Sequence, residues 1–81
     1  MQQITKRQIQ VLLQLLEDSQ PVTTKELAAQ QNVSVRTIKY DLDTIRLWLK
    51  ARNQDLTSKR SQGVWLTLSD SERIKLKSEL M

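Results

Sequence analysis

Residues 34–42 read SVRTIKYDL, and their spacing predicts a helix with one face for the protein and one for a partner. The apolar residues recur at intervals of four, three and four along one stripe, formed by Ile38, Leu42, Ile45 and Leu49. The opposite face carries Arg36, Tyr40, Asp43 and Leu47, flanked by Thr37, Lys39 and Thr44. A structural surface helix more often carries supporting Glu and Lys pairs, whereas Arg, Lys, Tyr and Thr can reach base edges and phosphates. The outward face therefore indicates DNA as the partner.

Hydroxyl residues at three places mark where helices begin. Thr5 with Gln8, and Thr23 with Glu26, have the spacing of a capping box, and Ser34 directly precedes the apolar stripe. We expect one helix from residue 6 to about residue 18, a second from 24 to about 31, and a third from 35 onward. The core stripe of the first helix is expected to consist of Ile9, Leu12, Leu13 and Leu16.

A short connection joins the second and third predicted helices. Asn32 is the residue best suited to a left-handed turn there, because Asn tolerates a positive φ better than its non-glycine neighbours do. So short a turn forces the helices to cross steeply, and a helix-turn-helix pushes its second helix out of the surface in this way. Ala28 and Ala29 suit a close crossing, although Leu-Ala-Ala is also ordinary helix-forming sequence.

After the third helix the apolar period changes from that of a helix to that of a strand. Residues 56–60 and 64–68 read as two strands, and residues 61–63 place the only Gly of the chain at the turn. An extended segment around Pro21 could pair with the edge of this hairpin. Residues 69–72 can cap a last, weakly amphipathic helix. We predict a mainly α (α+β) fold: a winged helix-turn-helix with a three-helix core, a hairpin wing and a C-terminal helix, in one domain over residues 1–81.

The net charge of the chain is concentrated in one segment. Residues 36–60 contain seven Lys or Arg and three Asp, so they hold the whole net charge of +4, while the residues on either side are balanced. A localised basic segment attracts a polyanion better than the same charge spread evenly. The alternative is a solvated helix face.

The composition argues against several classes of function. The chain has no Cys and no His, so it lacks a thiol nucleophile and the usual transition-metal ligands. It also lacks a glycine-rich phosphate loop, and its carboxylates are scattered. We therefore expect no enzyme activity, no metal and no cofactor. No apolar run approaches the ~20 residues of a membrane span, and the N-terminus has no secretory segment, so the expected location is the cytoplasm.

The candidate DNA-binding residues lie at the start of the third helix and in the wing, and comprise Ser34, Arg36, Thr37, Lys39, Tyr40, Lys59, Arg60 and Gln62. Arg36 is the first candidate for base readout, because a guanidinium can bond guanine O6 and N7 together. Lys39 and Tyr40 could bond bases or phosphates, and Thr37 and Ser34 a phosphate at the helix N-terminus. The wing residues could face DNA or protein.

Three further residues have structural interpretations. Asp41 lies near the buried edge of its helix, so we expect it to pair with a base on another helix, Arg7 being one candidate. Trp48 and Trp65 are expected to form hydrophobic cover between the third helix and the wing. Platforms for single-stranded nucleic acid normally use several exposed aromatic residues, and this chain has no Phe.

The run from residue 24 to residue 42, with ELA at 26–28, VS at 33–34, RTI at 36–38 and DL at 41–42, resembles the winged helix-turn-helix of bacterial transcription regulators. It is similar to the deoxyribonucleoside-repressor (DeoR) type. It is closer to sugar-operon regulators that carry phosphotransferase-system regulation domains, because of RTIKYDL at 36–42 and QGVWL at 62–66. The resemblance covers about residues 7–68. It departs from the DeoR pattern at Lys39 and Tyr40, where two Arg are usual, and at Asn32, which replaces a frequent turn Gly.

This resemblance implies a sequence-specific operator-binding domain. It further implies a homodimer in the full-length protein, with regulatory domains on the same polypeptide and residues 70–81 as a helix leading to them. A winged-helix adaptor that binds protein is the alternative, because this fold also serves that purpose. RNA is a third possibility, but an RNA duplex hides its major groove from such a helix.

Overall fold

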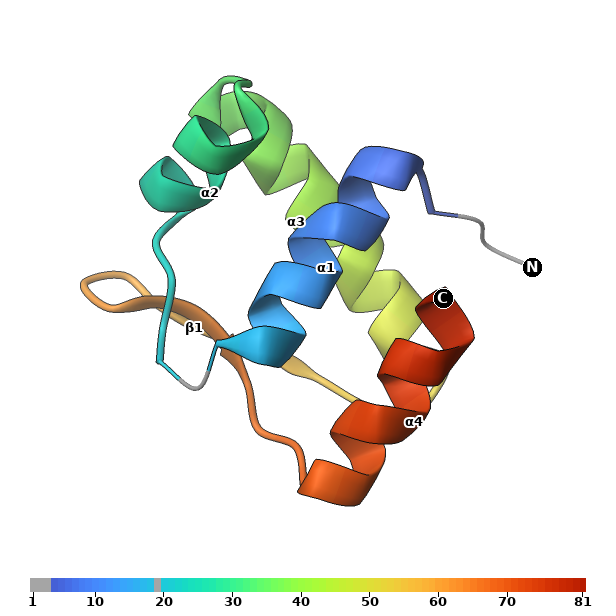
Figure 1. The fold of residues 1–81 in the computed structure, drawn as a ribbon. Helices are drawn as coiled ribbons and strands as arrows, with labels where there is room; N and C mark the ends of the chain where they lie inside the picture. Colours follow the sequence, from blue (N-terminus) through green and yellow to red (C-terminus); the bar gives the residue numbers. More distant parts are fainter. Residues whose placement is uncertain (1–3, 19) are drawn as a thin grey trace.

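Three helices followed by a hairpin and a fourth helix form the chain in the computed structural model, which describes residues 4–18 and 20–81. The helices α1 (Lys6–Glu17), α2 (Thr24–Gln31) and α3 (Val35–Lys50) precede strands β1 (Leu56–Lys59) and β2 (Gly63–Leu66), and α4 (Asp70–Leu80) comes last. Figure 1 shows α1 and α3 side by side, with the hairpin and α4 at the end away from the α2–α3 turn. This arrangement is the winged helix-turn-helix predicted from the sequence.

Each helix begins at a capping residue that the sequence had indicated. The Thr5 hydroxyl accepts the Gln8 N–H at 3.1 Å, and the Gln8 side chain accepts the Thr5 N–H at 2.9 Å, which completes a capping box. Ser69 begins α4 with the same reciprocal bonds. Thr23 accepts the N–H of Glu26 at 3.1 Å, but the Glu26 carboxylate bonds to the Thr23 hydroxyl at 3.2 Å instead of its backbone. The expected capping box at α2 is therefore only half formed.

The turn between α2 and α3 has the predicted geometry. Asn32 lies in the left-handed region with φ 56° and ψ 46°, and the Val33 N–H reaches back to the Ala28 carbonyl at 3.0 Å. Ala28 is buried, as a close crossing requires, whereas Ala29 is exposed. The expectation that both alanines serve the crossing was therefore right for Ala28 and wrong for Ala29.

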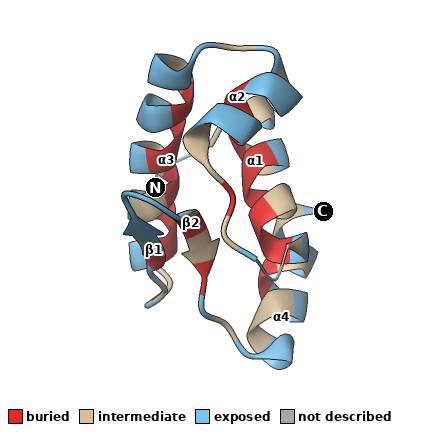
Figure 2. Cartoon of the chain, turned by 90° about the vertical axis from the view of Figure 1, so that its left-hand side faces the viewer, coloured by how far each residue is buried: buried red, intermediate tan, exposed pale blue. Residues whose placement is uncertain are grey.

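The core lies between the inner faces of α1 and α3, where much of the red ribbon of Figure 2 is found. The predicted stripe of α3 is confirmed: Ile38, Leu42, Ile45 and Leu49 are all buried. The predicted stripe of α1 is partly wrong, because the buried residues are Gln8, Val11, Leu12, Leu15 and Leu16. Ile9 and Leu13 are only half-buried. The buried face of α1 thus joins four apolar side chains with Gln8, whose Nε2 donates to the buried Asp41 at 3.0 Å.

The hairpin is shorter than predicted and is held at a backbone contact. Leu56 pairs with Leu66 and Lys59 with Gly63, which leaves residues 60–62 as the turn. Val22 pairs with Val64 through N–H to O bonds of 2.9 and 2.8 Å, so the predicted extended segment near Pro21 is confirmed. Gly63 has φ 110°, and a Cβ there would lie 2.4 Å from the Val22 carbonyl oxygen. Gly63 therefore serves this contact in β2 instead of lying within the turn.

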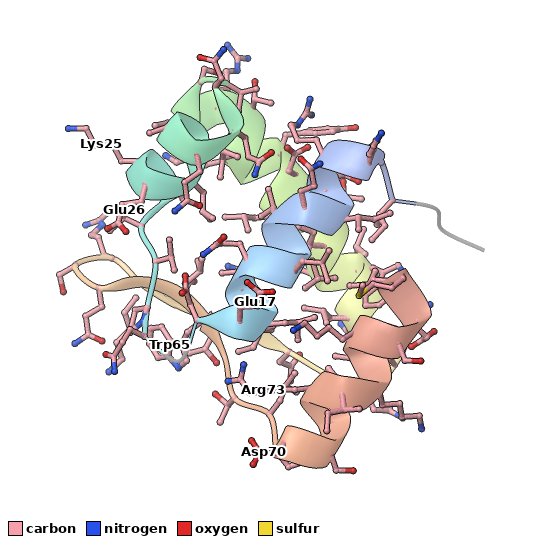
Figure 3. The ribbon with its side chains drawn as sticks, in the orientation of Figure 1. Glu17, Lys25, Glu26, Trp65, Asp70 and Arg73 are labelled. Carbon is pink, nitrogen blue, oxygen red and sulfur yellow. The ribbon has the colours of Figure 1, made fainter. Side chains whose placement is uncertain are left out.

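Alternation along β2 separates its side chains into two groups. Val64 and Leu66 are buried against the helices, so Trp65 lies on the other face of the hairpin and is half-buried. Figure 3 shows Trp65 beside the segment that joins α1 and α2. The expectation that Trp65 fills the space between α3 and the wing was therefore wrong. Trp48 is buried as expected, with the Arg52 guanidinium 3.6 Å from its ring centroid.

The last helix is attached to the domain by two apolar side chains, Leu76 and the partly buried Leu80, and by several polar contacts. Leu76 is its one buried residue, and Ile74 is 68% exposed. Arg73 donates to the carbonyl of Leu16, near the end of α1, where Figure 3 shows it close to Glu17. At the other end of the helix Glu79 pairs with Arg52 at 3.1 Å. Within the described residues, no helix combines the length and the apolar character needed to cross a membrane.

Candidate nucleic-acid interface

The first turn of α3 places two hydroxyl groups at the helix N-terminus. The Ser34 hydroxyl accepts the Thr37 N–H at 3.1 Å and lies 3.0 Å from the Thr37 hydroxyl. Ser34 is exposed and Thr37 half-buried. Ser34 is therefore first a cap, and both hydroxyls stand where the positive end of the helix dipole favours an anion.

The outward face of α3 presents the three side chains predicted for base and phosphate contact. Arg36, Lys39 and Tyr40 are all exposed, and Tyr40 leaves 70% of its surface to solvent. Across residues 4–18 and 20–81, neither Arg36 nor Lys39 forms an ion pair with a carboxylate. Their charges are therefore available to a ligand.

The hairpin end carries the other three predicted residues. Lys59 closes β1, Arg60 and Gln62 lie in the turn, and all three are exposed. The Gln62 N–H donates to the Lys59 carbonyl at 3.1 Å, which shapes the turn. The structure thus places all three wing residues at the surface, and two of them, Lys59 and Arg60, line the same cleft as Lys39.

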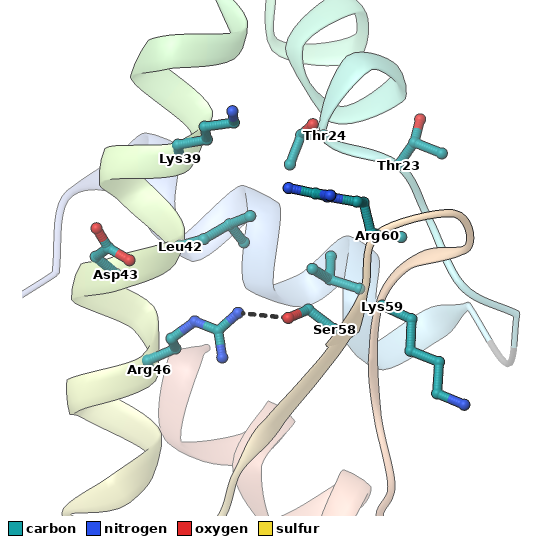
Figure 4. A pocket seen from close by; sticks show the side chains of 11 residues that line it. Thr23, Thr24, Lys39, Leu42, Asp43, Arg46, Ser58, Lys59 and Arg60 are labelled. Carbon is teal, nitrogen blue, oxygen red and sulfur yellow. Dashed lines mark hydrogen bonds between the residues drawn. The ribbon is translucent and has the colours of Figure 1, made fainter.

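A cleft of about 490 Å³ separates α3 from the hairpin and the start of α2. Its basic lining residues come from two elements: Lys39 and Arg46 from α3, and Lys59 and Arg60 from the hairpin. Figure 4 shows the Arg60 guanidinium reaching across the opening toward Lys39, with Thr24 above it, while Lys59 extends away from the opening. Two side chains of the same charge therefore face each other across the cleft, one from α3 and one from the hairpin turn.

Two basic residues of the segment 36–60, Arg46 and Arg52, form hydrogen bonds within the protein. Arg46 donates to the Leu56 carbonyl and to the Ser58 hydroxyl, each at 3.0 Å. Arg52 donates to the Trp48 carbonyl at 3.0 Å and pairs with Glu79. The charge excess of residues 36–60 therefore includes two guanidinium groups that hold the fold together.

The carboxylate of Asp41 is fully buried and belongs to the core, as expected. Arg7 donates to it from Nε at 2.7 Å and from Nη2 at 3.0 Å, and Gln8 Nε2 donates at 3.0 Å. Burial alone would raise the pKa of Asp41, but the hydrogen bonds from Arg7 and Gln8 and the charge of Arg7 outweigh it and leave this pKa lowered. The hydrogen bond and charge of Asp41 raise the pKa of Arg7 in turn. Asp41 is thus a structural residue.

Sequence reasoning missed Thr24 and the structural use of Arg46. Thr24 lines the cleft because α2 begins opposite the hairpin turn, and Arg46 lies on its floor. The sequence predicts Arg46 only as one charge of the basic segment 36–60. Its spacing of four from Leu42 was the available signal, because it puts Arg46 one turn along the edge of the buried stripe.

In the part of the chain that the structure describes, no group of three carboxylates is placed to hold a metal ion. The polar side chains brought together in the cleft are cations, hydroxyls and a single carboxylate, Asp43. Such a set can bind an anion by charge and by hydrogen bonding.

The comparisons with known proteins agree with this geometry. A family model described as "HTH domain" matches residues 7–64, which include α1, α2, α3 and most of the hairpin. The chain therefore belongs to this helix-turn-helix family, whose members are DNA-binding domains. No curated protein matches the chain.

Proposed function

We propose that this domain binds operator DNA sequence-specifically, as the DNA-recognition part of a bacterial transcription regulator. The observation that carries the proposal is the cleft, in which Lys39 and Arg60 extend toward each other beside the exposed Arg36 and Tyr40. A surface with more basic than acidic side chains beside the exposed face of α3 suits a duplex, because phosphates supply negative charge and the major groove accepts a helix.

The proposed contacts divide into contacts that read bases and contacts with the DNA backbone. Arg36 reads a guanine, with Tyr40 contacting bases or backbone beside it. Lys39 and Arg60 bind backbone phosphates from the two walls of the cleft, while Lys59 and Gln62 extend the contact along the wing. Ser34 and Thr37 hold a phosphate at the N-terminus of α3.

The biological setting is proposed from the resemblance to sugar-operon regulators. On that basis the target is an operator of a sugar or carbohydrate operon in the bacterial cytoplasm. The full-length protein binds as a homodimer, because operators usually present two half-sites, and α4 of this single domain leads to regulatory domains on the same polypeptide.

The test begins with selection of duplexes from a random-sequence library, because the operator is unknown. Fluorescence anisotropy then compares a selected duplex with a scrambled duplex of the same composition over a salt series. We expect preference for the selected duplex and a steep loss of affinity, about 0.9 log unit per phosphate contact for each tenfold rise in salt.

Arg36→Ala and the double variant Lys59→Ala/Arg60→Ala test the assignment of residues. Arg36→Ala should relax the selected sequence at one base pair, worth about 1–3 kcal/mol, and the double variant should lower the salt slope. Lys75→Ala, which removes an exposed charge from α4, is the matched control and should change neither. Unchanged affinity and slope in the first two variants would contradict the assignment.

A protein-binding adaptor is the second candidate, favoured by apolar surface on the same helix face. Tyr40 is 70% exposed and Leu47 is 53% exposed. Burial of such residues is typical of the centre of a protein interface. Duplex binding without sequence preference, together with loss of partner binding on Leu47→Ser, would favour this function.

A further inference from the structure

Arg46 connects the recognition helix to the wing by two hydrogen bonds. From its place in α3, Nη1 donates to the backbone carbonyl of Leu56 and Nη2 to the hydroxyl of Ser58, each at 3.0 Å. Figure 4 shows the bond to Ser58 crossing the floor of the cleft, below Lys39 and Arg60. One planar group therefore holds both a main-chain and a side-chain atom of β1.

The hairpin is attached along both of its edges, and the two attachments differ in kind. β2 is held by backbone bonds between Val64 and Val22, which fix it relative to the segment before α2. β1 is held to α3 by Arg46, whose guanidinium is rigid and directs its N–H groups along fixed lines. Leu56 is also buried in the core, so Arg46 adds a polar contact between α3 and β1 to this apolar one.

We propose that Arg46 is a positioning residue for DNA binding, which holds the wing at the spacing that lets Arg60 reach a backbone phosphate while α3 occupies the groove. This inference rests on the proposed function. Arg46 donates from both terminal nitrogens to β1, whereas neither Lys39 nor Arg60 forms an ion pair among the described residues, and the proposal gives the three residues different roles on that basis.

A positioning residue and a contact residue differ in how their effects combine. If Arg46 acts through the wing, replacing it also removes the contribution of Arg60 to DNA affinity. The changes in binding free energy caused by the two substitutions are then not additive. If Arg46 contacted a phosphate itself, the two losses in affinity would multiply and each would lower the salt slope separately.

The experiment is a double-mutant cycle on the selected duplex. Arg46→Met and Arg60→Gln should each weaken binding about tenfold, and the double variant should bind little worse than either one. The matched control is Lys50→Met, which removes one exposed charge from the next turn of α3. Its effect should multiply with that of Arg60→Gln. Multiplying effects for Arg46→Met would overturn the proposal.

A measurement without DNA examines the wing directly. ¹⁵N relaxation of the amides of residues 57–63 should report greater motion than in wild type for Arg46→Met and for Ser58→Ala, which does not change the net charge. Lys50→Met should show no such increase. Arg46→Lys should not restore order or affinity, because an ammonium lacks the planar fork. Unchanged wing motion in Arg46→Met would also overturn the proposal. Wild-type protein that binds no duplex would instead contradict the proposed function itself.

Discussion

The two sides of α3 differ in whether their basic side chains are paired with a carboxylate. Toward α1, Arg7 meets the buried carboxylate of Asp41 in a two-nitrogen contact, and Gln8 supplies a third donor. Toward the hairpin, Lys39 and Arg60 extend toward each other with no carboxylate paired to either among the described residues. The same helix therefore carries a neutralised contact that stabilises the fold and an unbalanced one that suits an anionic ligand.

The difference also separates the free energy of unfolding from the free energy of binding. The Asp41 contact is complete without a ligand, since the structure has no buried side-chain polar atom without a partner in its described part. The cleft contains one carboxylate, Asp43, which forms no ion pair with its four basic side chains, so most of the counter-charge must come from a ligand. Substitutions on the α1 side should therefore change stability, and those in the cleft should change DNA affinity.

The largest effect on stability is expected when the hairpin is detached from the segment before α2. This change would remove the wall of the cleft that faces α3. In Gly63→Ala the new Cβ would lie 2.4 Å from the Val22 carbonyl oxygen, on a backbone with φ 110°. Because the obstacle is main chain, the contact between Val22 and Val64 must open. We expect a loss of about 3 kcal/mol in the free energy of unfolding, measured by urea denaturation.

Ser61→Ala is the control for this prediction, since it changes an exposed residue of the same turn. It should leave unfolding within about 0.5 kcal/mol of wild type. Amide hydrogen exchange at Val22 and Val64 should accelerate in Gly63→Ala alone. Wild-type exchange there would show that the backbone accommodates the methyl group without opening the contact.

The next largest effect on stability is expected at Asp41, on the side of α3 that faces α1. Asp41→Asn replaces an oxygen that accepts from a guanidinium with an NH₂ group, so donors face donors in a buried place. We expect about 2 kcal/mol of destabilisation at neutral pH, measured by urea unfolding. Asp43→Asn is the same substitution at an exposed position two residues along α3, and should change stability by less than about 0.5 kcal/mol.

The pH dependence of this effect has a defined sign. Because the pKa of Asp41 is lowered in the folded state, its ionised carboxylate stabilises the fold fully above the ordinary carboxyl pKa of about 3.9. That contribution is lost as the pH falls through the lower, folded-state pKa. The stability difference between wild type and Asp41→Asn should therefore narrow below about pH 4. A difference that widened in acid would contradict the assigned shift.

Local signals made most of the fold predictable, whereas the site depended on tertiary packing. Thr5, Ser34 and Asn32 were identified correctly because caps and left-handed turns depend on neighbouring residues. The α1 stripe was misplaced because six of residues 9–16 are apolar, so their spacing fits more than one face, and the buried partner of Gln8 lies 33 positions away.

The cleft was less predictable for the same reason. Lys39 and Arg60 were both expected on the binding surface, but the sequence does not show that their side chains approach from opposite walls. Nor does it show that Arg46 is already bonded to β1, because that contact forms only once the hairpin folds back onto α3. Charge along the chain therefore predicts a basic surface, while packing determines which of its charges remain available.

The smallest effects on stability are expected from substitutions of two adjacent wing residues, Lys59 and Arg60. The same substitutions test most directly whether the cleft differs from the rest of the basic surface. Arg60→Gln removes a charge that faces Lys39 in the cleft, while Lys59→Gln removes one that extends away from it. Both should change unfolding by less than about 0.5 kcal/mol, with Arg60→Gln on the stabilising side because a like charge is removed. Anisotropy should show about a tenfold loss of duplex affinity and a salt slope reduced by about 0.9 for Arg60→Gln, and about a threefold loss at most for Lys59→Gln. Equal losses would mean that DNA meets the wing as a uniform basic surface, so that the cleft has no separate role in holding a phosphate.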